Sequence, residues 1–173
     1  MPIEIERKFL VASGEWKSAV TRRQWYRQGY ISATPCGTVR VRLCASHATI
    51  AVKGPRKGCV RQEFEYVIPV DHADDMLSRL CAKPLVEKVR HWVTHGAVTW
   101  QVDEFSGVAA GLVVAEIELE RPDQMFALPE WVGAEVTNDP RYQNSAIVRG
   151  AWRRTGRRHT GTTRAAAEPS AAP

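Results

Sequence analysis

The sequence predicts an α+β protein that is mainly β, with about eight antiparallel strands and three or four helices. Two observations predict it. Segments of six to nine residues alternate apolar and polar side chains along most of the chain, which is typical of strands with one buried face. Turn-forming residues separate these segments, as in KGPRKG (53–58) and SG (106–107). An all-β barrel and an α+β domain both fit this pattern.

The strands are expected, in chain order, at residues 3–11, 26–33, 37–43, 49–54, 60–68, 86–94, 98–105 and 112–120. Helices are fewer. Asp71 is a suitable N-cap for a helix over 72–82, and Ser13 for a short helix over 13–20. Asp139 followed by Pro140 predicts the start of a last helix, since proline is favoured at the first helical position.

Composition indicates a single folded domain without a membrane segment. The chain has 173 residues, 44% of them hydrophobic and 25% charged, which is ordinary for a globular protein. It has neither an apolar leader nor a run approaching the roughly 20 apolar residues that span a bilayer, so we expect a cytoplasmic protein. The four cysteines form no Cys-x-x-Cys pair and are expected to be free thiols. His91 and His95 have no third ligand nearby, so zinc is not expected.

The positive charge is concentrated at the C-terminus. The net charge is +5, and residues 153–173 contribute +4 of it. We therefore expect a folded domain over residues 1–152 and a basic, disordered tail over residues 153–173. Because charges in the domain nearly balance, a broad nucleic-acid-binding face is not expected.

The polar positions of the predicted strands are almost all ionic. On residues 3–11, for example, Glu4, Glu6 and Lys8 alternate with Ile3 and Ile5. A solvated face explains any one strand, but the repetition of like charges two residues apart favours a bound counter-charge. Carboxylate pairs suit Mg²⁺ or Mn²⁺, and arginines and lysines suit phosphate oxygens. One site that holds both sets would bind a metal-complexed polyphosphate, and a closed barrel could house it.

The order of these motifs resembles the CYTH superfamily, also called triphosphate tunnel metalloenzymes. Glu4-x-Glu6-x-Lys8 resembles its N-terminal signature. The later matches are RQGYI (27–31), VRVRL (39–43), AVKG (51–54), RQEFEY (61–66), VEKVRH (86–91), VDEF (102–105), AEIELE (115–120) and EVTNDPRYQNSAI (135–147). They extend to about residue 150 and look most like the small bacterial branch, although Ile147 stands where leucine is usual.

The resemblance implies an eight-stranded closed antiparallel barrel with a charged interior, a tunnel, and a few helices outside. It also implies hydrolysis or cyclisation of a triphosphate with a divalent metal. The implied metal ligands are Glu4, Glu6, Asp103, Glu116 and Glu118. The implied triphosphate-binding residues are Lys8, Arg40, Arg42, Lys53, Arg61, Lys88 and Arg90. The catalytic candidates are Lys8 and Lys88, which would assist the leaving group with a lowered pKa, and Glu63, which would position water or support the metal. Glu65 and Glu120, at strand ends, are expected in solvent.

Three functions remain open from the sequence. The favoured one is hydrolysis of inorganic tripolyphosphate or a small organic triphosphate. A class IV-type adenylyl cyclase and a non-catalytic polyphosphate- or nucleotide-binding module are the alternatives. The sequence selects neither Mg²⁺ nor Mn²⁺, and it leaves the oligomeric state open, with a homodimer as one option.

Overall fold

The computed structural model describes residues 2–45 and 47–155. Its strands are β1 (Ile3–Val11), β2 (Val20–Thr34), β3 (Gly37–Cys44), β4 (His47–Lys53), β5 (Val60–Ile68), β6 (Val86–His95), β7 (Val98–Phe105), β8 (Val113–Glu118) and β9 (Val132–Glu135). Its α-helices are α1 (Val70–Arg79) and α2 (Asn144–Ile147), and its 3-10 helices are η1 (Glu15–Ala19), η2 (Gly107–Ala109), η3 (Pro140–Tyr142) and η4 (Ala151–Thr155).

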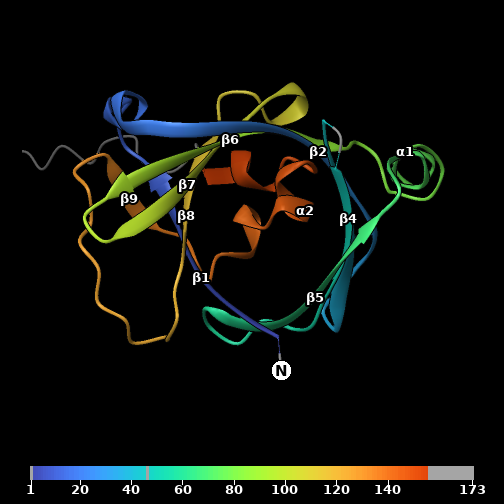
Figure 1. Ribbon diagram of the computed structural model, residues 1–173, viewed down its shortest axis with the longest axis horizontal. Helices are drawn as coiled ribbons and strands as arrows, with labels where there is room; N and C mark the ends of the chain where they lie inside the picture. Colours follow the sequence, from blue (N-terminus) through green and yellow to red (C-terminus); the bar gives the residue numbers. More distant parts are fainter. Residues whose placement is uncertain (1, 46, 156–173) are drawn as a thin grey trace, which may run out of the picture.

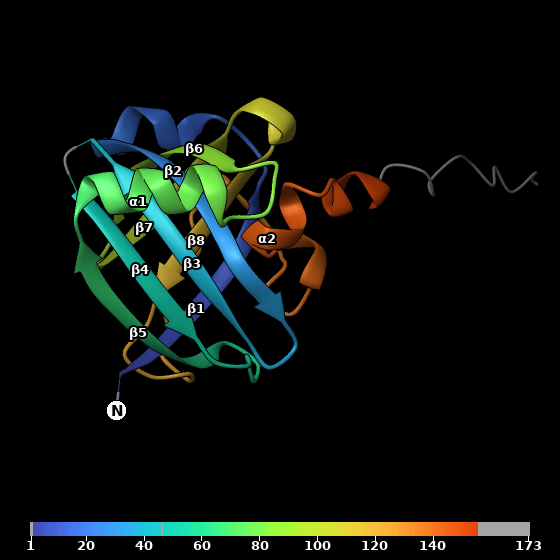
Figure 2. The ribbon, with the colours of Figure 1, turned by 90° about the vertical axis from the view of Figure 1, so that its right-hand side faces the viewer.

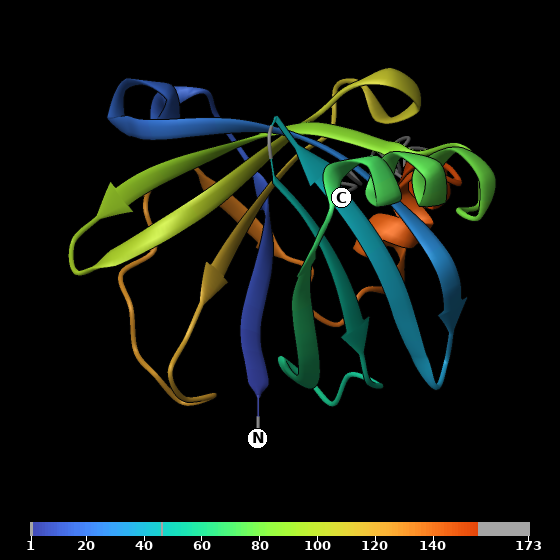
Figure 3. The same ribbon diagram turned by 45° about the vertical axis from the view of Figure 1, so that its right-hand side comes forward.

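The strands form a closed antiparallel barrel (Figures 1 and 3). The strand order is β5-β4-β3-β2-β6-β7-β8-β1, and pairing of β5 with β1 closes the ring. The closing seam is short, with Ile3 opposite Gln62, Glu4 opposite Arg61, and Ile5 opposite Val60. The eight-stranded barrel expected from the sequence is therefore confirmed.

Two strands differ from the expectation. β2 begins at Val20, because its first half pairs with β6 as far as Val93, so it is much longer than the segment 26–33. β9 was not expected at all. It pairs with the end of β1, where Phe9 lies opposite Glu135, and has too few residues to show an alternating pattern.

Helix α1 lies against the outside of the barrel over β3 and β4 (Figure 2). Its buried face, Ala73 and Leu77, packs with Val41 and Ala48. The N-cap is Pro69 and not Asp71, so the helix begins two residues earlier than expected. Gly29 of β2 is required at the far end of α1, because a Cβ there would lie 2.6 Å from Cβ of Cys81.

The C-terminal segment lies across one end of the barrel (Figures 1 and 2). As expected, Asp139 caps its start and accepts a hydrogen bond from the backbone N–H of Arg141 at 3.0 Å. The helix is interrupted, however, because the backbone is extended at Gln143, between η3 and α2. This interruption turns the chain so that Gln143 and the start of α2 reach the barrel interior.

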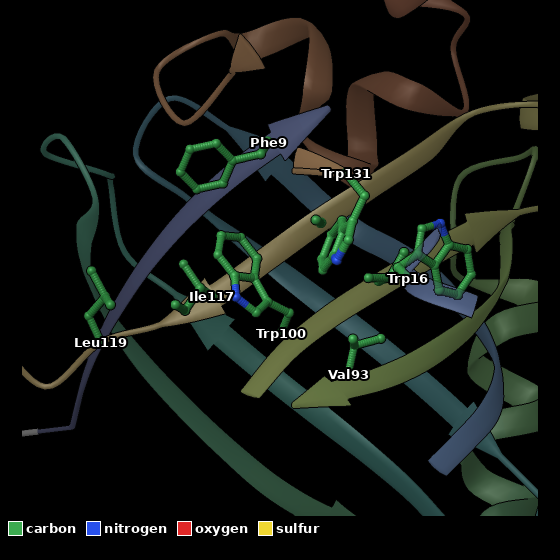
Figure 4. Packing of buried hydrophobic residues seen from close by; sticks show 9 residues of the cluster. Phe9, Trp16, Val93, Trp100, Ile117, Leu119 and Trp131 are labelled. Carbon is green, nitrogen blue, oxygen red and sulfur yellow. The ribbon is translucent and has the colours of Figure 1, made fainter. Parts of the chain in front are cut away.

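The barrel has an apolar cluster on each side of its wall. Outside, Trp100 packs against Phe9 and Trp131 with ring centroids 5.5 and 5.6 Å apart (Figure 4). Inside, one end of the barrel is filled by a second cluster, here called the apolar half. Its buried members are Val86, Phe105, Ala109, Leu112, Val114, Val136, Tyr142 and Ile147.

The remaining expectations concern the cysteines, a membrane-spanning segment and the C-terminal tail. The four cysteines are free thiols, as expected. In the described ranges, no helix is long and apolar enough to span a bilayer. Most of the expected tail, residues 156–173, lies outside the described residues, although the guanidinium of Arg153 donates to the carbonyl of Val108 at 2.7 Å.

Candidate functional site: a charged cavity inside the barrel

The barrel interior holds a cavity of about 310 Å³, here called the main cavity. Seven cationic and six acidic side chains line it, which makes it almost neutral. The cations are Lys8, Arg40, Arg42, Lys53, Arg56, Arg61 and Arg90, and the acids are Glu4, Glu6, Glu63, Glu65, Glu116 and Glu118. Tyr30, Thr38, Gln143, Asn144 and Ser145 complete the lining.

Strand alternation places these side chains together, since residues two apart on a strand share a face. Glu4, Glu6 and Lys8 come from β1, and Arg40 and Arg42 from β3. Of the residues implied for the site, all line the main cavity except Lys88 and Asp103. Those two are fully buried and lie beneath Arg90, which does line the cavity.

A network of ion pairs joins the strands at the closing seam. Lys53 Nζ lies 3.0 Å from Glu4 Oε1 and 2.9 Å from Glu63 Oε1, and Arg61 also contacts Glu4. Burial opposes the charged form of Glu4, but Lys53 and Arg61 together lower its pKa well below the ordinary value. Burial raises the pKa of Glu63, and the neighbouring charge of Glu4 adds to the effect. Lys53 therefore faces two carboxylates of unequal acidity.

A second network lies deeper. Lys8 Nζ is 2.8 Å from Glu116 Oε1, and Arg90 bridges Glu116 and Asp103, reaching Asp103 Oδ1 and Oδ2 at 2.7 Å. Lys88 contacts the same Asp103 carboxylate. Burial disfavours the charged form of Asp103, but Arg90 and Lys88 outweigh it and lower its pKa. Asp103 is thus a shared counter-ion for two buried cations.

The two candidate lysines differ in acidity. Burial, reinforced by repulsion from Arg90, lowers the pKa of Lys88 to about 7. For Lys8, burial acts in the same direction, but the nearby Glu116 and Glu6 raise its pKa above the ordinary value. The expectation of a lowered pKa was therefore right for Lys88 and wrong for Lys8, because Lys8 lies beside two carboxylates.

Arg42 has no carboxylate partner within the described residues. Its Nε donates to Gln28 Oε1 at 3.1 Å, and its guanidinium lies 5.0 Å from the ring centre of Tyr26. Burial and the nearby Arg40 lower its pKa to about 10. Arg40 is itself 6% exposed, and its Nε finds no hydrogen-bond partner in the described chain. Both guanidinium groups retain capacity for an anion.

The acidic side chains are suitable ligands for a hard cation. Glu6 of β1 lies directly opposite Glu118 of β8, and Glu116 is two residues away from Glu118 on the same strand. Opposed like charges are unfavourable unless a cation lies between them, and their oxygen atoms are the donors that Mg²⁺ and Mn²⁺ prefer. Among residues 2–45 and 47–155, no three potential ligands are gathered closely enough to hold a metal as they stand. The donor chemistry fits, while Arg56 and Lys8 both lie near Oε1 of Glu6, at 3.1 and 3.9 Å.

Sequence reasoning missed several lining residues. Glu65 was expected in solvent, but it lines the main cavity and accepts from Arg40 at 2.6 Å, while its side chain remains 40% exposed. Glu120 is exposed, as expected. Arg56 and Gln143 could not be found from strand alternation, because both lie outside regular strands. The motif RQEFEY already indicated Glu65, because it lies two residues after Glu63 and so points to the same face of the strand.

A closed antiparallel barrel whose interior is built from paired cations and carboxylates defines a class of protein that binds a multiply charged anion within a tunnel. The family follows from comparison. Residues 2–149 match the CYTH domain, so the chain belongs to the CYTH domain family.

Relatives of known name agree with this assignment. The chain is 45% identical over 150 residues to a protein of Acetivibrio thermocellus named inorganic triphosphatase, covering 87% of this chain and 96% of that one. It is 36% identical over 156 residues to the inorganic triphosphatase of Nitrosomonas europaea, covering 84% and 96%. A crystal structure of an inorganic triphosphatase superposes with a TM-score of 0.59 at 34% identity, covering 84% of this chain and 97% of that one.

Proposed function

We propose that this protein is an enzyme that hydrolyses inorganic tripolyphosphate, or a small triphosphate, in the main cavity with the aid of a divalent metal. The observation that carries the proposal is the pair Arg40 and Arg42. Arg40 is buried with an unpaired Nε, Arg42 is half-buried without a carboxylate partner in the described chain, and both lie beside further cations. The names of the relatives support the same reaction. The main cavity has a single aromatic lining residue in the described chain, Tyr30, which favours an inorganic chain over a stacked base.

In this reaction a water oxygen bonds to a terminal phosphorus while the bridging P–O bond breaks. The bridging oxygen keeps the electron pair and takes up a proton, so phosphate and diphosphate are formed. Arg40, Lys53 and Arg61 hold the phosphate oxygens and offset the charge of the transition state. Lys8, which carries its charge beside Glu116 and Glu6, donates a hydrogen bond to the leaving oxygen.

The remaining candidates support this arrangement. Glu63 positions the attacking water, since its raised pKa suits a group that accepts a proton. Lys88 does not reach the main cavity, so it acts through Asp103 on Arg90. Glu6, Glu116 and Glu118 hold the divalent metal, Mg²⁺ or Mn²⁺, which when bound neutralises phosphate charge. Asp103 supports Glu116 through Arg90, which pairs with both, and Glu4 holds Lys53 and Arg61 in place for the phosphate oxygens.

A phosphate-release screen tests the function. Tripolyphosphate, ATP, thiamine triphosphate and pyrophosphate are compared with Mg²⁺, with Mn²⁺ and with a chelator, and the nucleotide products are analysed for cyclisation. We expect tripolyphosphate to be the best substrate and the chelator to abolish turnover. Cyclic nucleotide as the main product would favour the cyclase, and tight binding without any release would favour the binding module.

Two matched variants test whether Glu118 is a ligand of the metal. Glu118 and Glu120 lie two apart and both are exposed, but only Glu118 lines the main cavity. We expect Glu118→Gln to lower turnover at least tenfold and to be partly rescued by excess metal, while Glu120→Gln stays within about twofold of the wild type, as surface substitutions usually do. Equal activity of the two variants would contradict the assignment of Glu118.

A further inference from the structure

A second cavity, of about 300 Å³, adjoins the main cavity and shares Arg42 and Glu65 with it. It lies toward the start of β2, whereas Tyr30, near the end of that strand, packs against the apolar half. Its other lining residues are Arg22, Gln24, Tyr26, Cys44, Ala45, His47 and Thr49. None of these lines the main cavity, so the second cavity is a distinct space reached past Arg42.

The charge of the second cavity is positive. Arg22 and Arg42 lack a carboxylate partner in the described part of the chain, and Arg22 instead lies 4.5 Å from the ring centre of Trp92. The single acid, Glu65, is already bound by Arg40 at 2.6 Å. An anion that entered would meet two guanidinium groups and no free carboxylate.

Thr49 gives an independent sign of a missing ligand. Its residue is only 5% exposed, and Oγ1 has no hydrogen-bond partner within the described residues. It lies opposite Arg42 in the β3–β4 register, so hydroxyl and guanidinium belong to neighbouring strands. Buried hydroxyls are usually satisfied, and one that is not indicates an absent partner.

We propose that the second cavity binds inorganic phosphate and is the route by which this product leaves the main cavity. That the phosphate is a reaction product rests on the proposed function, whereas the binding of phosphate in the second cavity does not. Arg22 and Arg42 present planar donors that match phosphate oxygens, and the hydroxyl of Thr49 donates to a third oxygen. Arg42 is the shared group, so a phosphate leaving the triphosphate site passes to the second cavity without losing its first contact.

The test measures binding of inorganic phosphate by titration calorimetry in the absence of metal and substrate. Thr49→Val keeps the side-chain shape and removes only the hydroxyl, and Arg22→Gln changes a different strand. Each is expected to weaken phosphate binding about tenfold, the usual size for a hydrogen bond to a charged group. The control is Thr38→Val, which makes the same change in the main cavity alone. It should leave phosphate affinity unchanged.

A further readout separates this inference from the proposed function. Phosphate should inhibit tripolyphosphate hydrolysis about tenfold less strongly in Thr49→Val than in the wild type, with little change in KM. If phosphate does not bind at millimolar concentration, or if only Thr38→Val weakens it, the inference is wrong while the triphosphatase assay stands on its own. If Thr49→Val leaves phosphate binding intact and raises KM for ATP, the cavity holds the organic part of a substrate and the phosphate assignment fails.

Discussion

The two halves of the barrel interior share strands β1, β6 and β8 but have opposite chemistry. On β1, Lys8 faces the main cavity and Leu10 packs in the apolar half. The same change occurs between Glu116 and Val114 on β8. On β1 and β8, a step of two residues therefore leads from a charged side chain of the main cavity to a packed apolar one. The apolar half buries hydrophobic surface that the charged half does not.

The difference shows how a small barrel tolerates a charged interior. Each buried charge in the main cavity is balanced by a neighbour, whereas the half-buried Arg42 has no carboxylate partner in the described chain. The C-terminal segment seals the apolar half with Tyr142 and Ile147. Paired ions contribute little net stability, because desolvation offsets their attraction. Stability and binding should therefore respond separately to changes in the two halves.

The largest effect is expected from Asp103→Ala at the base of the charged half. The change leaves Lys88 and Arg90 buried without their shared counter-ion, which costs about 3–5 kcal/mol in the free energy of unfolding. Urea denaturation measures it. Adding Lys88→Met should recover at least half of the loss, because one uncompensated cation is removed. A loss below about 1 kcal/mol in the single variant would show that the pair is solvated and not part of a buried network.

A smaller loss, of about 3 kcal/mol, is expected from Ile147→Ala in the apolar half, because a fully buried side chain leaves a cavity. Here KM for tripolyphosphate should stay within about twofold, since α2 contacts the main cavity through Asn144 and Ser145 and not through Ile147. Denaturation and steady-state kinetics on one preparation give both values. A large rise in KM without a loss of stability would mean that the two halves are not separable.

The pH dependence of stability sharpens the comparison at Lys88. Its pKa is lowered from 10.5 to about 7 in the folded protein, so between these values the unfolded chain binds a proton that the folded protein does not. Stability contributed by this group therefore rises as pH increases from about 7 toward 10.5. Over that window the urea midpoint of the wild type should rise relative to that of Lys88→Met. If the difference between the two urea midpoints does not change with pH, the pKa of Lys88 in the folded protein lies near its ordinary value.

The smallest effect is expected from deleting residues 156–173, which lie outside the described residues. The truncated protein keeps Arg153 and its contact with Val108, and turnover should stay within about twofold. Assays at low and high salt check whether the removed charge attracts anionic partners, an effect that salt screens. A truncated protein that folds and loses most of its turnover would show that the tail contributes to the site.

Strand alternation predicted much of the barrel and most of the charged lining. This is because the face of a strand to which a side chain points depends only on its position along the local sequence. Glu4, Arg40 and Glu116 could be assigned to one interior on this basis. Alternation could not reveal that Asp103 is shared by Lys88 and Arg90, because this depends on the β6–β7 register and on depth in the barrel. It also gave no sign that Gln143 would reach the interior, since the chain turns there outside any regular element.

The closing seam couples the integrity of the barrel to its site. It joins β1 to β5 over three residue pairs, whereas β1 and β8 share five, and the middle pair of the seam is Glu4 and Arg61. A local opening at this seam would separate the two side chains and dismantle that part of the cavity. An anion held by Arg61 of β5 and Lys8 of β1 would in turn tie the two strands of the seam together. Amide hydrogen exchange in β1 and β5 should thus slow when an anion is bound in the main cavity. Exchange at the short β1–β5 pairing would then report whether the site is occupied.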